Sequence, residues 1–362
     1  MKRCVTCLMP ETARNIAFNE SGECLACQRA KMPVDRKARL QELSDLCDKY
    51  RRDDGSYDCI IPVSGGKDSF FQVYWLKYRM NMNPLLVSVT DEWQHTKAGE
   101  HNAHQISKEF RCDMITLRLN PGLVLETTRW GFENIGSSNW AIDMAIYAWP
   151  LQMAIKLGIQ LVVYGENVEW EYGCKTGVDT WDAKGQILNN VVNIQNTPVL
   201  RATEANCLKY PTPEEVEASG LQPVYLSYFT GWDGLHNTNV ARKYGFRDLR
   251  GEWDRDGHID PYWQCDSKGY TFNYFLKYAK YGYSKATDVA SHLIRKGHLT
   301  REAALEMVRA TEHKLDQKVL DDFLSFTGYS DNQFWNIMEK WYNKDLFEYR
   351  SAEWTLKNEH KL

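Results

Sequence analysis

The chain has 362 residues, of which 43% are hydrophobic and 25% are charged, and its formal net charge is -4. This length allows one large core or two modest ones, and the composition is that of an ordinary soluble globular protein. The negative net charge argues against a dominant nucleic-acid surface, which needs clustered Lys and Arg, although a local basic patch stays open. We find no run of about 18 apolar residues and no apolar stretch typical of a secretory signal, so we expect a cytoplasmic protein without a membrane span.

Four of the ten cysteines form two Cys-x-x-Cys pairs near the N-terminus. Because cytosolic thiols are kept reduced, we do not expect a disulfide framework. The pairs are Cys4 with Cys7 and Cys24 with Cys27, and residues 19–22 between them are typical of a hairpin tip. Two-residue gaps allow both sulfurs of a pair to face one ion, so the spacing predicts a structural Zn²⁺ site in a module of residues 1–34. The alternatives are four unliganded thiols or a redox pair.

A glycine-containing loop follows the first apolar run of the chain. Apolar residues at helical spacing predict a linker helix within residues 35–56, and residues 57–63 form an apolar run of strand length. A helical pattern covers residues 70–77. The loop between strand and helix is Ser64-Gly65-Gly66-Lys67-Asp68-Ser69.

A strand, a glycine turn and a helix together form a phosphate-binding arrangement. Adjacent glycines let anion oxygens approach the backbone amides, and the helix N-terminus adds unpaired N–H groups and a favourable dipole. Lys67 adds a positive charge, and Asp68 either holds Mg²⁺ or complements the helix dipole. The spacing is not that of the Walker motif. We therefore predict that this loop binds ATP and that ATP is split to AMP and pyrophosphate; a glycine-rich helix start without a ligand is the alternative.

The alternation of strands and helices continues through the first half of the chain. Further strands are expected at residues 84–90, 113–117 and 159–164, with helices at 101–110, 123–132 and 141–157. This order predicts an α/β fold with a doubly wound parallel sheet, in a nucleotide domain of residues 57–200. Ligands of such sheets lie beyond the carboxyl ends of the strands. The loop, the segment 89–93 with Val89 and Asp91, and the segment Gly165-Glu166-Asn167 should therefore meet at one nucleotide.

Residues 201–362 are expected to form a substrate-binding and helical C-terminal region. After Gly165 the sequence is irregular, and polar residues stand among aromatic ones, a mixture that suits sugar recognition. Our candidates for substrate contact or proton transfer are Glu169, Glu171, His236 and Asp266. A core of aromatics with satisfied polar neighbours is the alternative.

The tail of the chain reads as helical. A helix is expected from Thr287 to Gly297, Thr300 is expected to cap the next one, and Ser330 with Gln333 has the spacing of a capping box. These helices would form a bundle beside the nucleotide domain or a surface for a partner.

The chain resembles the pyrophosphatase-loop ATPases, and more closely the N-acetyl sugar amidotransferases of surface-polysaccharide (O-antigen) and flagellin-sugar biosynthesis. The resemblance covers nearly the whole chain. The segments that carry it are Cys4–Pro10, Ser64–Ser69, Asn83–Val89, Tyr164–Gly173, Arg295–Arg301 and Trp341–Glu348. One departure is Cys174, where a small residue such as glycine is expected. The resemblance implies a fold like that of the adenine-nucleotide α-hydrolases, with ATP, Mg²⁺ and Zn²⁺.

The resemblance also implies a reaction and partners. An acetamido group on a nucleotide-activated N-acetyl sugar would be adenylated on its oxygen, and ammonia would replace that oxygen to give an acetamidino group. The chain lacks the Gly-x-Cys-x-Gly elbow of a glutaminase. Ammonia would therefore come from a separate glutaminase subunit with a cyclase-like companion, similar to imidazole glycerol phosphate synthase.

Two other functions stay open. A tRNA thiolase can pair this loop with a cysteine module, but it usually needs a catalytic cysteine near the nucleotide, and only Cys59, Cys112 and Cys174 are placed for that role. A non-catalytic subunit could bind nucleotide and act only as a scaffold.

Overall fold

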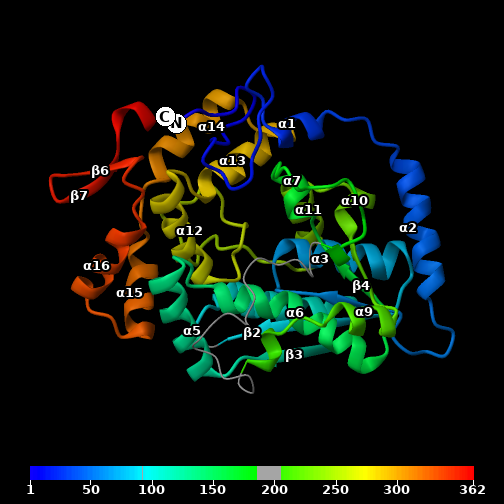
Figure 1. Ribbon diagram of the computed structural model, residues 1–362. Coiled ribbons are helices and arrows are strands. Elements are labelled where there is room, and N and C mark those ends of the chain that lie inside the picture. Colours follow the sequence, from blue (N-terminus) through cyan, green and yellow to red (C-terminus); the bar gives the residue numbers. More distant parts are fainter. Residues whose placement is uncertain (92, 186–204) are drawn as a thin grey trace.

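A five-stranded parallel sheet forms the centre of the computed structural model, which describes residues 1–91, 93–185 and 205–362 (Figure 1). Its strand order is β3-β2-β1-β4-β5. The strands are β1 (Cys59–Pro62), β2 (Pro84–Thr90), β3 (Met114–Arg118), β4 (Leu161–Tyr164) and β5 (Gln222–Tyr225). This is the predicted α/β fold with a doubly wound parallel sheet, and the order reverses between β1 and β4.

The central strand shows why helices cover both faces of the sheet. Ile60 and Ile61 are both fully buried, but successive strand residues point to opposite faces. Ile60 packs with the buried side chains of α6 (Trp140–Leu157), whereas Ile61 packs with α3 (Lys67–Tyr74) and α4 (Lys97–Phe110). A parallel strand buried on both faces reads as a continuous apolar run, which is the signal that the sequence carries here.

The expected elements of the first half form close to their predicted positions. The linker helix is α2 (Arg36–Tyr50), and α1 (Leu25–Ala30) precedes it. The helix after the loop begins at Lys67 and continues as a π-helical turn over Trp75–Arg79. Between β3 and β4 the chain forms α5 (Pro121–Asn134) and α6.

The edge strand β5 is an element that the sequence analysis did not predict. It pairs in parallel with β4, from Leu161 opposite Gln222 to Tyr164 opposite Tyr225. The sheet therefore includes a strand beyond residue 200, in a region that we expected to be irregular. The strand has four residues and contains Pro223, a residue that sheets accept on edge strands because it cannot donate a ladder hydrogen bond.

The C-terminal part is mainly helical, as expected. Its elements are α9 (Pro213–Ser219), α10 (Leu226–Thr230), α11 (Gly234–Lys243), α12 (Lys268–Tyr281), α13 (Lys285–Arg295), α14 (Arg301–Thr311), α15 (Gln317–Thr327), α16 (Asp331–Trp341), β6 (Phe347–Arg350) and β7 (Glu353–Leu356). The Thr300 cap and the Ser330–Gln333 capping box are both present. Helix α13 begins two residues before the expected start.

The antiparallel hairpin β6–β7 was not predicted. Its turn residues Ser351 and Ala352 have φ angles of 51° and 65°, a left-handed conformation that Asn-Gly usually signals. The N-terminal amine of Met1 lies 2.6 Å from His360 Nδ1, so the two ends of the chain meet beside this hairpin (Figure 1).

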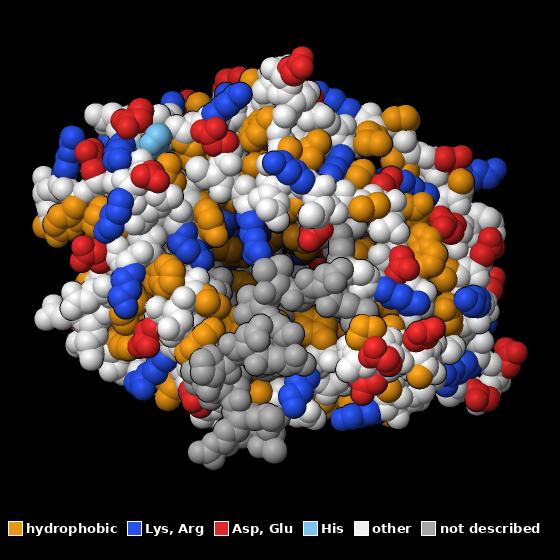
Figure 2. Space-filling model, viewed as in Figure 1, with side chains coloured by type: hydrophobic (Ala, Val, Ile, Leu, Met, Phe, Trp, Pro, Cys, Tyr) orange, Lys and Arg blue, Asp and Glu red, His pale blue; other side chains and the backbone are white. Residues whose placement is uncertain are grey.

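Charged side chains are mixed on the surface. On the face drawn in Figure 2, most Lys and Arg side chains lie among Asp and Glu side chains. No helix in the described part of the chain is both long and apolar enough to span a bilayer.

Candidate nucleotide and metal sites

The loop after β1 turns tightly against α4. Gly65 has a φ of +86°, and a Cβ there would lie 3.1 Å from Ala103 N and 3.2 Å from Gly99 O. These are backbone atoms of a packed helix, so a side chain would force the helix away. The Ser64 N–H donates to Ser69 Oγ over 3.0 Å, which closes the loop on the first turn of α3.

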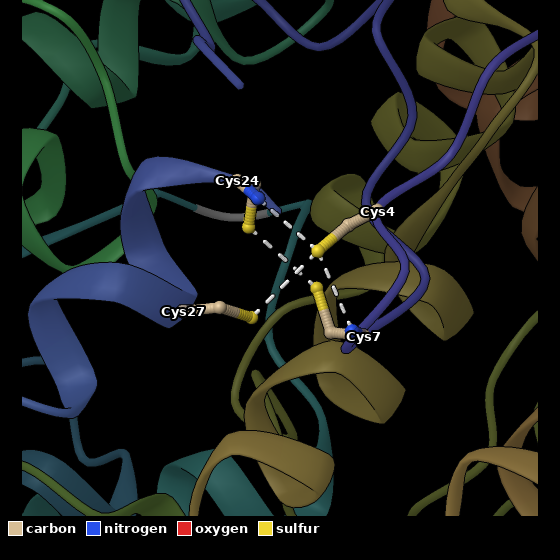
Figure 3. A group of neighbouring side chains, drawn as sticks. All are labelled: Cys4, Cys7, Cys24 and Cys27. Atoms are coloured by element: carbon tan, nitrogen blue, oxygen red, sulfur yellow. Dashed lines mark hydrogen bonds between the residues drawn. The ribbon is translucent and has the colours of Figure 1, made fainter. Parts of the chain in front are cut away.

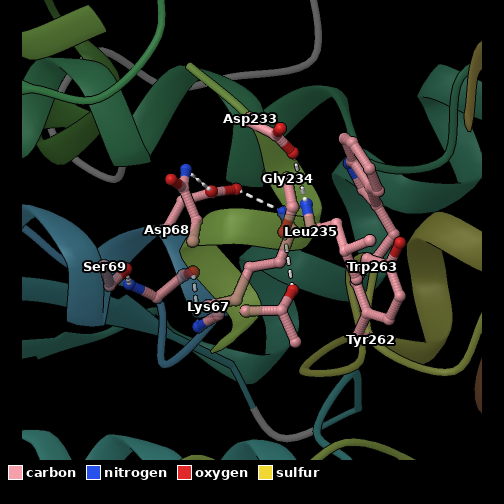
Figure 4. A network of polar contacts seen from close by, with 12 residues as sticks. Lys67, Asp68, Ser69, Asp233, Gly234, Leu235, Tyr262 and Trp263 are labelled. Carbon is pink, nitrogen blue, oxygen red and sulfur yellow. Dashed lines mark hydrogen bonds and ion pairs between the residues drawn. The ribbon is translucent and has the colours of Figure 1, made fainter. Parts of the chain in front are cut away.

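A buried lysine stands at the start of α3 (Figure 4). The Lys67 side chain is 2% exposed, and its Nζ lies 2.5 Å from Asp68 Oδ2 and 4.1 Å from the centre of the Trp263 ring. Asn237 Nδ2 on α11 donates to Asp68 Oδ1 over 2.8 Å. Together with the N-terminal N–H groups of α3, this cation forms a site suited to an anion.

A cavity of about 210 Å³ lies over the loop, where the carboxyl ends of β1, β2 and β4 meet. It brings together the predicted residues Ser64, Gly66, Lys67, Asp68, Val89, Asp91, Glu166 and Asp266. Its other lining residues are Thr90, Gln94, His95, Ile142, Ile146, Tyr262, Trp263, Gln264, Ser267 and Tyr270. This convergence at the β1/β4 switch point is the arrangement expected of a ligand site in such a sheet.

Three carboxyl groups in this cavity are shifted toward the protonated form. Burial raises the pKa of Glu166 to about 7; the charge of Asp68 adds to the rise, whereas Lys67 and Lys285 oppose it. Burial also raises the pKa values of Asp91 and Asp266. The Asp91 carboxylate accepts hydrogen bonds from the N–H groups of Trp93 and Gln94 at 2.8 and 2.9 Å, which opposes the rise. With a pKa of about 7, Glu166 can exchange a proton near neutral pH.

Lys285 is a residue of this site that the sequence analysis missed. It is 4% exposed at the start of α13, and its Nζ lies 5.1 Å from the centre of the Trp263 ring, which Lys67 also approaches. Burial lowers the pKa of Lys285 to about 8. Lys285 belongs to no motif near the loop, so only the packing of α13 against the sheet domain brings it here.

A larger cavity lies elsewhere. It has a volume of about 1170 Å³ and lies between the helices α12, α14 and α16 and the hairpin β6–β7. Neither the loop residues nor the strands of the central sheet line it, so its size does not make it the candidate nucleotide site.

The four N-terminal cysteines converge on one point (Figure 3). Their sulfur atoms all lie within 4.8 Å of one another, with 3.9 Å between Cys4 and Cys27 and 3.7 Å between Cys7 and Cys24. A tetrahedral ion with Zn–S bonds of about 2.3 Å places its sulfurs roughly 3.8 Å apart. The N–H groups of Cys7 and Cys24 both point at the Cys4 sulfur, at 3.5 and 3.2 Å, as they do around a thiolate ligand. The described cluster can therefore hold a metal ion.

Comparison with known proteins finds a family model that matches the C-terminal part of the chain. Residues 227–361 match the family model described as LPS biosynthesis protein WbpG-like, C-terminal domain. This part of the chain is therefore similar to the C-terminal domain of WbpG-like proteins. We call residues 227–361 the WbpG-like region. An uncharacterised protein of Methanocaldococcus jannaschii is 29% identical over 118 residues, which make up 32% of this chain and 42% of that relative's length.

Three solved structures show weaker similarity. The U34-tRNA thiolase NcsA of Methanococcus maripaludis, with its 4Fe–4S cluster, is 14% identical with a TM-score of 0.32, and 86% of each chain is covered. NMN synthetase of Francisella tularensis is 14% identical with a TM-score of 0.29, covering 58% of this chain and 87% of that one. NAD⁺ synthetase of Burkholderia pseudomallei is 13% identical with a TM-score of 0.26, covering 61% and 91%. TM-scores this low do not establish a shared fold, so the fold rests on the sheet topology.

The remaining predicted residues lie around the cavity. Gly65 and Ser69 shape the loop without lining the cavity, and a Cβ at Gly165 would lie 2.9 Å from the Trp232 ring. Glu92 lies outside the described residues. The other three candidates also lie outside the cavity: Glu169 and Glu171 on α7 (Val168–Glu171), and the exposed His236 on α11. Their roles stay predictions. Of the four candidates for substrate contact or proton transfer, only Asp266 lines the cavity.

We expect the purified protein to hold one Zn²⁺ per chain. Replacing Cys7 by Ser should lower both the zinc content and the free energy of unfolding, because a structural ion contributes folding energy through all its ligands. Elemental analysis and denaturant unfolding measure the two effects. The matched variant Cys207→Ser, a half-buried cysteine outside the cluster, should keep its zinc. Chelation that leaves both metal content and stability unchanged would contradict the assignment.

Glu166 should leave a signature in the pH dependence of stability. Its folded pKa of about 7 lies above its usual value of 4.5, so the folded state binds more protons between these values. The free energy of unfolding should therefore fall as pH rises from about 4.5 through about 7. Glu166→Gln should remove this contribution, whereas Glu217→Gln, at an exposed position on α9, should keep it. Parallel stability profiles for wild type and Glu166→Gln would refute the assignment.

Proposed function

We propose that this protein is an ATP-dependent amidotransferase that acts on a nucleotide-linked N-acetyl sugar in surface-polysaccharide biosynthesis. The proposal rests on one observation: two different parts of the chain line the same cavity. The phosphate loop supplies Lys67 and Asp68, and the WbpG-like region supplies Tyr262, Trp263 and Asp266. A nucleotide-activating loop thus shares one cavity with a region whose family is that of LPS biosynthesis proteins.

The first chemical step would use the start of α3. The acetamido oxygen attacks the α-phosphorus of ATP, and pyrophosphate leaves. The N–H groups at the helix start and the Lys67 ammonium stabilise the negative charge that develops on this leaving group. The Asp68 carboxylate offers hard oxygen ligands for Mg²⁺, which neutralises polyphosphate charge when bound.

The second step would use the carboxyl groups. The adenylated oxygen is a good leaving group, so ammonia adds to the acetamido carbon and AMP is expelled. The attacking nitrogen must lose a proton, and Glu166, with a pKa of about 7, can accept it near neutral pH. Asp266, whose pKa is also raised by burial, lies in the same cavity. Glu166 would take the proton, and Asp266 would position the nucleophile.

Sulfur transfer has less support. Among the described residues, no cysteine lines the cavity over the loop. Cys59 and Cys112 are buried in the core under the sheet, and the Cys174 sulfur lies 3.7 Å from Arg14 O. A scaffold that only binds nucleotide would not require carboxyl groups poised to exchange protons.

Ammonia would reach the enzyme from a separate glutaminase subunit with a cyclase-like companion. We expect the purified protein to form product from ATP, the sugar and ammonium salts, with pyrophosphate release that depends on both sugar and ammonium. UDP- and CMP-linked acetamido sugars should be screened for the mass loss of about one dalton that replacement of oxygen by NH produces. Equal rates with glutamine and with ammonium would contradict the separate glutaminase. Absence of product with every sugar would refute the amidotransferase proposal.

Lys67→Ala should lower the rate of pyrophosphate release roughly 10²- to 10³-fold while the protein stays folded, because a preorganised cation on the leaving group is lost. A pyrophosphate-coupled assay and thermal unfolding measure the two quantities. Lys108→Ala, an exposed lysine on α4, is the matched control and should keep the wild-type rate. Wild-type turnover in Lys67→Ala would refute the role of the loop.

A further inference from the structure

A second cavity, of about 300 Å³, lies between the cysteine module and the sheet domain. Its walls come from the segment that joins α1 to α2, from α7, from α10 and from the end of α13. The charged residues that line it are Arg29, Arg36, Arg39, Glu171, Asp179, Arg295 and Lys296. Five cations and two carboxylates thus line the same small space.

Two of the five cations already interact with groups of the protein itself. Arg39 Nη2 lies 2.6 Å from Asp179 Oδ2, and the Arg39 guanidinium lies 3.8 Å from the centre of the Tyr228 ring. The Arg29 guanidinium donates to four backbone carbonyls, at 2.9 to 3.1 Å, and lies 4.3 Å from the centre of the Trp170 ring. The four acceptors are the oxygens of Glu169, Trp170, Cys174 and Gly177. Neither arginine needs a ligand to satisfy its donors.

The other three cations face one carboxylate. Lys296, Arg295 and Arg36 all lower the pKa of Glu171, in that order, against the larger rise that burial causes. Among the described residues, none of the three forms a direct ion pair with Glu171. Arg36 Nη1 donates to Tyr228 O, and Arg295 Nη1 lies 3.9 Å from the Cys7 sulfur. Five cations and two carboxylates give the walls an excess of positive charge, which is unfavourable in a partly buried space without an anion, although the cysteine cluster beside Arg295 offsets part of it.

The position of this cavity relates it to the nucleotide site. Glu166 lines the cavity over the loop, whereas its neighbour Asn167 lines the second cavity. Trp232 also lines the second cavity and packs against Gly165. The segment Gly165–Asn167 after β4 is therefore a wall shared by the two cavities.

We propose that the second cavity binds the diphosphate of the nucleotide-linked sugar, so that the sugar extends past Gly165–Asn167 to the cavity over the loop. This inference rests on the proposed function. A diphosphate that joins a nucleoside to a sugar carries two negative charges, which would offset the excess of positive charge on these walls. Arg36, Arg295 and Lys296 hold the phosphates, and the half-buried Tyr228 ring lies beside them for contact with the base or ribose.

The test is direct binding of UDP, GDP and dTDP to the full-length protein, measured by calorimetry with excess α,β-methylene-ATP present to occupy the loop. We expect at least one nucleoside diphosphate to bind. Lys296→Ala and Arg36→Ala should each weaken that binding about tenfold or more, because each removes a charged hydrogen bond to phosphate. Lys37→Ala, a neighbouring exposed position on α2 that does not line the cavity, should bind as wild type. Thermal unfolding confirms that each variant is folded.

The outcomes separate this inference from the proposed function. No binding of any nucleoside diphosphate, or unchanged binding in both variants, overturns the inference. Inorganic pyrophosphate that binds as tightly as the nucleoside diphosphates identifies a simple anion site and also overturns it. Binding that depends on Lys296 and Arg36, in a protein that forms no acetamidino product, supports the second cavity while the amidotransferase proposal fails. Product formation with a wild-type KM for the sugar in both variants supports the reaction but rejects this cavity.

Discussion

The close approach of three backbone segments at Gly65 and Gly99 is the constraint on which the site depends. A Cβ at Gly99 would lie 2.8 Å from both Cα and O of Asp266, and one at Gly65 would lie 3.1 Å from Ala103 N. Because these positions lack side chains, the phosphate loop, helix α4 and the segment that carries Asp266 pack directly on one another. The WbpG-like region thereby reaches the nucleotide loop.

This packing concentrates charge in a place with little water. Lys67 and Lys285 approach the ring of Trp263, and burial raises the pKa values of Glu166 and Asp266. In such an environment electrostatic interactions are stronger than in water, and small movements of a proton change the local charge by a whole unit. The burial of charged groups makes the site costly to fold, but it also makes the site suited to stabilising a departing polyphosphate.

Much of this arrangement could be predicted from the sequence. The elements and residues that could not be predicted were missed for physical reasons. The strands β1, β2 and β4 are buried on both faces and therefore read as apolar runs, and the loop carries its glycines and charges in one short segment. Asp266 was found because it stands among aromatic residues, but Lys285 was not, since it comes from a helix start 218 residues beyond Lys67 in the chain. Strand β5 was missed because it is four residues long and contains proline. The hairpin β6–β7 was missed because its turn residues are Ser351 and Ala352, which do not signal a left-handed turn as Asn-Gly does. Local pattern detects elements with their own periodicity, whereas contacts between distant segments are decided by packing.

The guanidinium of Arg29 gives the cysteine module a second role. Arg29 follows Cys27 by two residues, and it gathers four carbonyl oxygens from the segment 169–177 around one planar group. These hydrogen bonds hold α7 in a fixed position relative to the cysteine cluster. If the cluster holds a metal ion, loss of that ion should disturb the wall of the second cavity at Glu171 before it affects the central sheet.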